Sequence, residues 1–222
     1  MRNVYRIAKT ELRMLFCSPI MWVLLLIFVM QASGIFSGLC WRIAHNNEWG
    51  DGYFSPGSFG FIMGMWMSTC GSLHFYIPLL TMGLISRELS TGSIKLLYSS
   101  PISNAQIVLG KFFSTVMFAV ILCVVLLLYV FVAGNIIEAF QWQATLVGLL
   151  GIFLLACTYI SIGLFVSSLT SYQFVAALGT YLLLALLLAV GGWWQEYDVV
   201  RDITYWLSIS GRAYTFVAGM IC

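Results

Sequence analysis

The sequence predicts an all-α polytopic membrane protein with five membrane-spanning helices. Hydrophobic residues make up 61% of the 222 residues and charged residues only 8%, whereas a soluble domain is about half apolar and about a quarter charged. A spanning helix needs roughly 20 apolar residues. The chain therefore has room for five or six spans in a single transmembrane domain, residues 1–222, and for no sizeable soluble domain.

The first 18 residues predict an amphipathic helix lying in the headgroup plane of the membrane. Apolar side chains such as Val4, Leu12 and Leu15 fall on one side of this helix, and a basic face would meet anionic lipid. Glu11 falls near the apolar side, where an unpaired carboxylate is costly. It either pairs with a base or a partner protein, or reaches water at the helix edge. The basic stripe consists of Arg2, Arg6, Lys9 and Arg13.

Five long apolar runs follow, separated by short polar segments. The second run contains Pro78, so it either spans with a tilt or breaks near its centre. The last span ends in an aromatic belt typical of the membrane interface. The predicted spans are residues 19–41, 59–85, 106–134, 144–169 and 174–194.

His74 is the one ionisable side chain predicted to lie deep within a span. A lone intramembrane histidine can contact a substrate or carry protons. The alternative is a neutral imidazole that forms a hydrogen bond with a neighbouring helix. His74 is therefore a candidate intramembrane polar site.

The polar stretch of residues 86–105 interrupts the apolar runs and concentrates charge. It holds Arg87, Glu88 and Lys95, and Lys111 follows where the third span begins. Between residues 92 and 98, apolar side chains recur at helical spacing, which predicts a short amphipathic helix that ends before Pro101. The apolar residues of that helix are Ile94, Leu97 and Tyr98.

The distribution of Lys and Arg predicts the orientation of the chain. Segments 1–18, 86–111 and 170–172 hold seven positive residues, whereas the opposite loops hold three. Because cytoplasmic loops carry the positive excess, the N-terminus and the polar stretch are expected in the cytoplasm. Residues 195–222 are expected on the outer side.

Several short patterns give the chain a resemblance to a known family. Residues 86–111 contain, in order, Glu88, Gly92-Ser93, Leu96-Leu97, Ser100-Pro101-Ile102-Ser103, Ile107 and Gly110-Lys111. Residues 11–19 contain Glu11-Leu12, Phe16 and Ser18-Pro19, and Trp206-Leu207-Ser208 comes late in the chain. In this order they resemble type-2 ABC exporter permeases, in particular those of bacterial gliding-motility-type systems.

The resemblance implies a coupling helix in the polar stretch that receives the motion of a separate ATPase subunit, which would bind ATP and magnesium. This chain would bind no cofactor. It would pair with a second permease, as a homodimer or heterodimer, in the bacterial cytoplasmic membrane. Residues 195–222 would form an outer re-entrant segment. The sixth span of the family is missing from these 222 residues, so either the sequence is a segment of a longer protein or the last helix is absent. The implied ATPase-docking residues are Arg87, Glu88, Gly92, Ser93, Ile94, Lys95, Leu97, Tyr98, Pro101 and Lys111.

Other function classes find less support in the residues. A G-x-x-x-x-G-K-[ST] phosphate loop is absent, as are H-E-x-x-H and G-x-S-x-G, so we expect no enzyme. An intramembrane serine protease would have to use Ser33 or Ser68 with His74, without a preorganised oxyanion hole. The six cysteines form no C-x-x-C pair, and we expect neither a metal site nor a nucleic-acid partner. An ion-coupled carrier and a non-transporting assembly subunit remain as alternatives.

Overall fold

In the computed structural model, residues 2–45, 58–93, 103–136 and 140–190 are described, and every regular element within them is a helix. Two of the seven helices, α1 and α4, are short, and the other five are long and apolar. Their bounds are α1 Arg2–Cys17, α2 Pro19–His45, α3 Ser58–Thr81, α4 Ser86–Thr91, α6 Asn104–Ile136, α7 Trp142–Leu169 and α8 Gln173–Val190.

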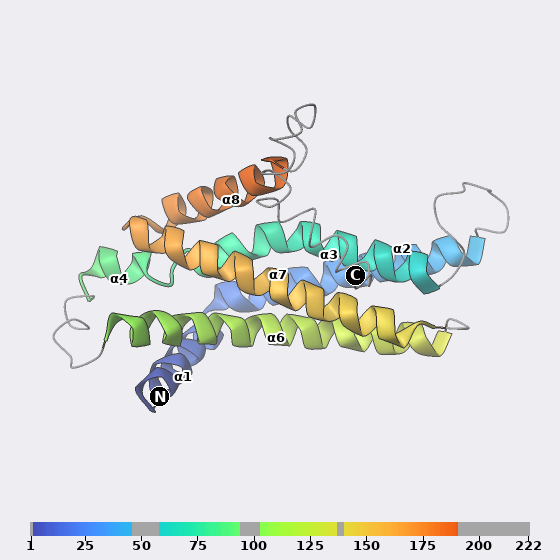
Figure 1. Ribbon diagram of the computed structural model, residues 1–222, viewed down its shortest axis with the longest axis horizontal. Coiled ribbons are helices and arrows are strands. Elements are labelled where there is room, and N and C mark those ends of the chain that lie inside the picture. The colour runs from blue at the N-terminus through green and yellow to red at the C-terminus, as the bar shows by residue number, and fades with distance from the viewer. Residues whose placement is uncertain (1, 46–57, 94–102, 137–139, 191–222) are drawn as a thin grey trace, which may run out of the picture.

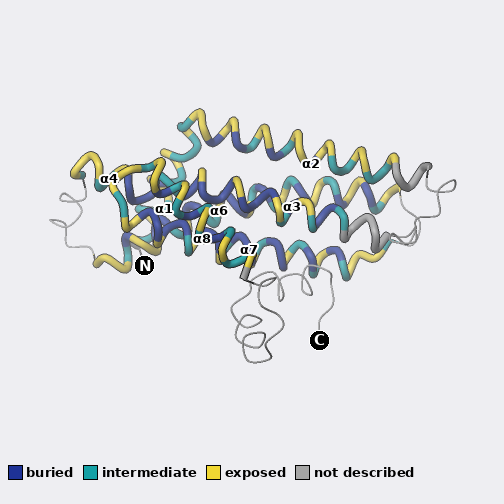
Figure 2. Tube along the Cα trace, turned by 90° about the horizontal axis from the view of Figure 1, so that it is seen from above, coloured by how far each residue is buried: buried dark blue, intermediate teal, exposed yellow. Residues whose placement is uncertain are grey.

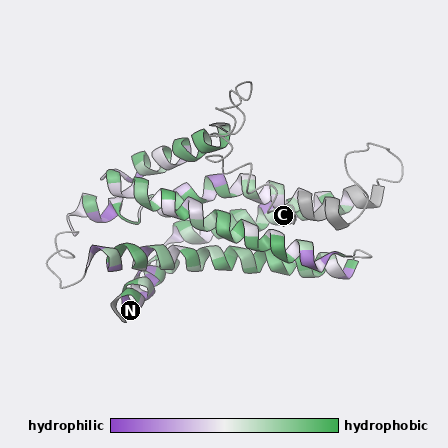
Figure 3. Ribbon diagram, viewed as in Figure 1, coloured by the Kyte–Doolittle hydropathy of each residue, from purple (hydrophilic) through white to green (hydrophobic). Residues whose placement is uncertain are grey.

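Three of these helices are long and apolar enough to cross a membrane, namely α2, α6 and α7. The apolar helix at residues 173–189 is shorter. Figure 3 shows hydrophobic residues along most of the long helices, with many of the hydrophilic ones near the ends of the bundle. The sequence therefore predicted an all-helical membrane protein correctly. The number of five spans stays a prediction.

The helices run back and forth along one long axis (Figure 1). One end of the bundle holds α1, α4, the start of α6 and the turn between α7 and α8, and we call it the charged end. Arg6, Lys9 and Arg13 of α1, Arg87 of α4 and Lys111 of α6 all lie on these elements. The end of α2, the start of α3, the end of α6 and the start of α7 lie at the opposite end.

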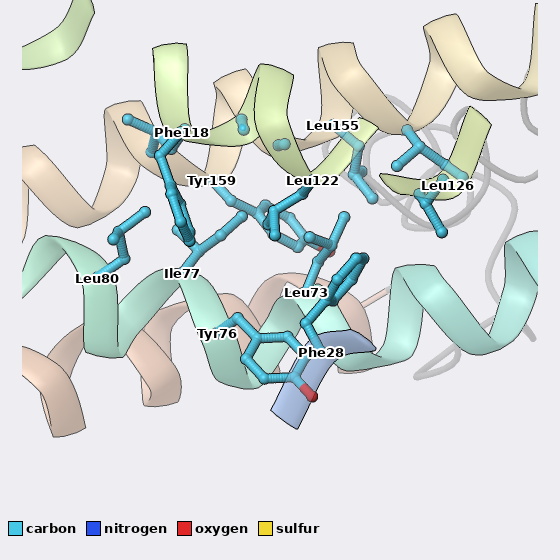
Figure 4. Packing of buried hydrophobic residues seen from close by; sticks show 14 of the residues in the cluster. Phe28, Leu73, Tyr76, Ile77, Leu80, Phe118, Leu122, Leu126, Leu155 and Tyr159 are labelled. Atoms are coloured by element: carbon cyan, nitrogen blue, oxygen red, sulfur yellow. The ribbon is translucent and has the colours of Figure 1, made fainter. Parts of the chain in front are cut away.

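The core lies between α3, α6 and α7, and Figure 4 shows how side chains from these helices interdigitate. Association of helices within lipid depends on van der Waals packing because lipid tails are as apolar as the side chains. Figure 2 shows α2 exposed along most of its length, so this helix offers much of its surface to the surroundings. The side chains labelled in Figure 4 are Phe28, Leu73, Tyr76, Ile77, Leu80, Phe118, Leu122, Leu126, Leu155 and Tyr159.

Pro78 does not break α3 near its centre. The helix continues past Pro78 and ends at Thr81, where the Met82 N–H donates to the Pro78 carbonyl at 3.0 Å. The second apolar run, predicted to reach residue 85, thus ends four residues early. Proline removes one backbone donor and restricts the residue before it, and both effects fall here within the last turns of the helix.

A close contact between α3 and α7 fixes their separation near the charged end. A Cβ atom on Gly163 would lie 2.2 Å from the hydroxyl oxygen of Thr81 and 2.8 Å from its Cβ. Thr81 is fully buried and its hydroxyl donates to the Ile77 carbonyl at 2.9 Å. The absence of a side chain at Gly163 lets the two helices approach closely.

We predict that Gly163→Ala destabilises the bundle by about 1–3 kcal/mol, because overpacking forces neighbouring side chains and backbone to shift. Reversible unfolding in mixed micelles would measure the loss. Gly34→Ala is the matched control, since a Cβ atom at Gly34 meets nothing within 4 Å. Equal stability of the two variants would contradict the contact between α3 and α7.

Candidate functional site

The short helix α4 begins where the chain leaves α3, and a serine from α7 stabilises this break. The Ser167 hydroxyl accepts hydrogen bonds from the backbone N–H groups of Ile85 and Ser86, each at 3.2 Å, and donates to the Met82 carbonyl at 3.1 Å. Ser167 is fully buried. It therefore satisfies backbone groups that a helix start leaves without intrahelical partners. Sequence reasoning missed this role, because a serine within an apolar span carries no signal of its partner.

Gly92 ends α4 in the left-handed conformation, with a φ of 71°. Its N–H donates to the Leu89 carbonyl at 3.3 Å, as is common at helix C-termini. Ser93 follows, and its hydroxyl lies 2.9 Å from that of Thr91. The observed helix thus occupies residues 86–91. The amphipathic helix predicted for residues 92–98 extends beyond the described residues. The predicted ATPase-docking residues Ile94, Lys95, Leu97, Tyr98 and Pro101 also lie outside them.

The Lys111 ammonium joins three helices at the charged end. Its Nζ donates to Glu11 Oε1 of α1 at 2.6 Å and to Glu88 Oε1 of α4 at 2.6 Å. A third bond, of 2.7 Å, goes to the carbonyl of Leu84, which lies between α3 and α4. An ammonium group has three N–H donors, so every donor of Lys111 is used. We call these four residues the Lys111 cluster.

The Lys111 cluster is shielded from solvent. The exposed fractions of the Lys111, Glu11 and Glu88 side chains are 2%, 7% and 17%. Removing one member of such a buried ion pair costs about 3–5 kcal/mol, because the remaining charge stays buried without a partner. An exposed ion pair contributes only about 0–1 kcal/mol. The cluster is thus a strong link between α1, α4 and α6.

The helix α1 also packs closely on α6 beside this cluster. A Cβ atom on Gly110 would lie 2.6 Å from the Cγ2 atom of Ile7, so the glycine leaves room for α1 to cross (Figure 1). Glu11 is the residue for which the sequence left two alternatives open. It pairs with a base, Lys111, and does not reach water at the helix edge.

The remaining basic residues of α1 and α4 point outward. Arg6, Lys9, Arg13 and Arg87 are all exposed. Arg2 also belongs to α1, but its side chain is not among the described ones. Among the described residues, the two ion pairs of Lys111 are the only ones present. The exposed cations therefore remain available to lipid or to a partner.

His74 lies within α3 and is enclosed by aromatic rings. Its ring makes edge contacts with Tyr159 of α7 and Tyr181 of α8, at centroid distances of 5.9 and 5.3 Å, and with Phe75. The side chain is 6% exposed, and its Nδ1 atom has no hydrogen-bond partner among the described residues. The expected hydrogen bond to a neighbouring helix is thus not seen at Nδ1.

The geometry needed for a serine protease is not formed in the described residues. The Ser33 hydroxyl donates to the Met30 carbonyl of its own helix at 2.8 Å, and His74 forms no hydrogen bond with Ser33 or Ser68. Cys17, Cys40, Cys70, Cys123 and Cys157 are free thiols. No group of three or more metal-ligating side chains occurs in the described part of the chain. The Lys111 cluster, which holds the ion pairs of the described residues, is therefore the candidate site.

We predict that Lys111→Met lowers the free energy of unfolding by about 3–5 kcal/mol, because two buried carboxylates lose their cation. The triple variant Lys111→Met, Glu11→Leu and Glu88→Leu should recover most of this loss, since apolar replacement of a buried ionic group is often neutral. Unfolding in mixed micelles measures both. Lys9→Met, at an exposed position of α1, is the control and should change stability little. A triple variant no more stable than Lys111→Met would exclude a buried ionic cluster.

Comparison with known families identifies the chain by its sequence over residues 62–195. Residues 62–195 match the model of the family described as ABC-2 family transporter protein. The match begins in α3 and includes α4, α6, α7 and α8, with both Glu88 and Lys111. No curated protein and no solved structure gave a significant match. Because the matched segment is well over half of the chain, the protein belongs to the ABC-2 family of transporter proteins.

Proposed function

We propose that the chain is the membrane-spanning permease subunit of an ABC exporter and that a separate ATPase subunit docks on α4 and the segment that follows it. The family supports a permease role. ATP and magnesium would bind in the ATPase subunit, and this chain would catalyse no reaction. Two permease copies, identical or different, would pair and form the transport path between them. The likeness to gliding-motility-type permeases remains a prediction.

One observation carries the proposal. The Lys111 cluster links α4, the helix on which the ATPase subunit would dock, to α1 and α6. A force applied to α4 acts on Glu88, and through the Lys111 ammonium on both α6 and Glu11 of α1. The bonds are short, and they are buried at Glu11 and partly buried at Glu88, so separating the ion pairs costs more than moving the helices together. This arrangement suits a domain that converts the motion of an ATPase into rearrangement of spanning helices.

The positive residues support a cytoplasmic location for the charged end. Arg6, Lys9, Arg13, Arg87 and Lys111 all lie there, and cytoplasmic segments carry the excess of Lys and Arg. An ATPase subunit has access to ATP on that side. The helix α1 would lie along the inner surface of the bacterial cytoplasmic membrane, with its exposed cations near anionic lipid.

The partner can be identified by photocrosslinking from Ser90, an exposed residue of α4. We expect a photoreactive amino acid at this position, introduced in native membranes, to capture a nucleotide-binding protein. Leu97, further along the same segment, is a second labelling position. Mass spectrometry of the crosslinked product would identify the partner.

Gln143 is the matched control, because it is exposed near the start of α7 at the opposite end of the bundle. A crosslink to the same nucleotide-binding protein from Gln143 would rule out docking at the charged end. Capture of lipid alone from Ser90 and Leu97, together with solute movement driven by an ion gradient in purified protein, would favour an ion-coupled carrier.

A further inference from the structure

A pocket opens beside the Lys111 cluster, where α1, the first turns of α2, the end of α3, α4 and the start of α8 meet. Its volume is about 100 Å³. One water molecule needs roughly 10–15 Å³ of such a volume, so the pocket admits a group of roughly seven to ten water-sized atoms. That is comparable with a phospholipid headgroup, and much smaller than a whole lipid.

The pocket combines an apolar wall with two opposite charges. Ile20 and Leu24 of α2 and Leu79 of α3 form part of the apolar lining, whereas Glu11 and Arg87 contribute the charges. Ile20 and Leu79 are also exposed on the outer surface of the bundle, which extends the apolar wall toward the surroundings. An amphiphile with a charged head and an apolar tail matches this lining.

The charge balance of the Lys111 cluster favours a cation in the pocket. Two carboxylates, Glu11 and Glu88, share the single ammonium of Lys111, so the ionised cluster carries one excess negative charge. Of the two carboxylates, Glu11 is the one that also lines the pocket. An uncompensated charge in a shielded site is costly, and a second ammonium placed against Glu11 would balance it.

Arg87 adds a site for an anion at the same pocket. Its side chain is exposed and forms no ion pair with any described residue. A guanidinium binds phosphate through paired hydrogen bonds of fixed geometry. A ligand that carries both an ammonium and a phosphate, with an apolar chain attached, therefore complements Glu11, Arg87 and the apolar wall together.

Two exposed aromatic side chains near the pocket favour a position at the level of the lipid headgroups. The Trp22 ring, one turn into α2, is exposed, and its N–H donates to the Phe16 carbonyl at 2.8 Å. Tyr172, in the turn before α8, is exposed as well. Exposed Trp and Tyr side chains are enriched at the boundary between hydrocarbon and headgroups. Both belong to segments that border the pocket.

We propose that this pocket binds the headgroup of an aminophospholipid, phosphatidylethanolamine, from the adjacent leaflet. The primary ammonium lies against Glu11, the phosphate lies against Arg87, and an acyl chain follows Ile20, Leu24 and Leu79. The lipid thereby completes the charge balance of the cluster that joins α1, α4 and α6. This binding site goes beyond the proposed transport function and can be tested without a transport assay.

Native mass spectrometry of the purified protein in detergent tests the proposal with three added lipids of the same acyl composition. Phosphatidylethanolamine has an ammonium with N–H donors, phosphatidylcholine has a quaternary ammonium without them, and phosphatidylglycerol has no cation. We expect phosphatidylethanolamine to bind roughly tenfold more tightly than either of the others, as loss of one charge-assisted hydrogen bond implies. Equal binding of all three would overturn the proposal.

Gly83→Leu is the variant that fills the pocket while keeping the three charged side chains of the Lys111 cluster. Gly83 lines the pocket, and a Cβ atom there meets nothing within 4 Å, so the added side chain should fill the site and abolish the tenfold preference. Gly71→Leu is the matched control on α3, because its Cβ also meets nothing and Gly71 is not part of the lining. An unchanged preference in Gly83→Leu would show that the lipid binds elsewhere.

Arg87→Gln tests the phosphate contact independently of the pocket's volume. We expect it to weaken phosphatidylethanolamine binding roughly tenfold, whereas Arg13→Gln, which removes the same charge at an exposed position of α1, should leave binding unchanged. Equal loss in both variants would point to general attraction of lipid by basic residues and would refute a specific site. Because Arg87 makes no ion pair in the described structure, this variant remains informative if Gly83→Leu fails to fold.

Discussion

The arrangement of the charged end depends on the buried ammonium of Lys111. The ammonium donates hydrogen bonds to Glu11 of the first helix and to Glu88 of the short helix α4. Its third bond goes to a backbone carbonyl between α3 and α4. A lysine on a spanning helix is costly unless its donors are satisfied, and here all three are. The requirement to satisfy this one group brings together segments that lie far apart in the sequence.

Two kinds of contact hold α4, and they differ in strength. The Lys111 cluster uses charge-assisted hydrogen bonds, which are roughly twice as strong as neutral ones. At the start of α4, the Ser167 hydroxyl of α7 bonds neutral backbone groups at 3.1 to 3.2 Å. Hydrogen bonds of this second kind exchange more easily. A displacement of α4 is therefore expected to carry α1 and α6 with it and to change the contact with α7.

The positions of the spanning helices could be predicted from the sequence because a long apolar run nearly determines a helix. The observed α2, α6 and α7 begin and end within a few residues of the predicted spans, apart from α2, which extends to His45. The pairing of Glu11 with Lys111 could not be derived, since the two residues lie 100 positions apart and local spacing carries no information about such a partner. Likewise, α4 occupies the polar residues 86–91 because α7 satisfies its first backbone groups.

The pocket beside Glu11 lies between the lipid-facing surface of the bundle and the Lys111 cluster. Because Glu11 belongs to both the Lys111 cluster and the pocket lining, a cation bound in the pocket changes the electrostatic environment of the bond between α1 and α6. The same cation would reduce the repulsion between the two carboxylates that share Lys111 and so stabilise the cluster. The strength of the connection between α4 and the spanning helices then depends on which lipid lies against it, since a headgroup without an ammonium leaves the excess charge in place.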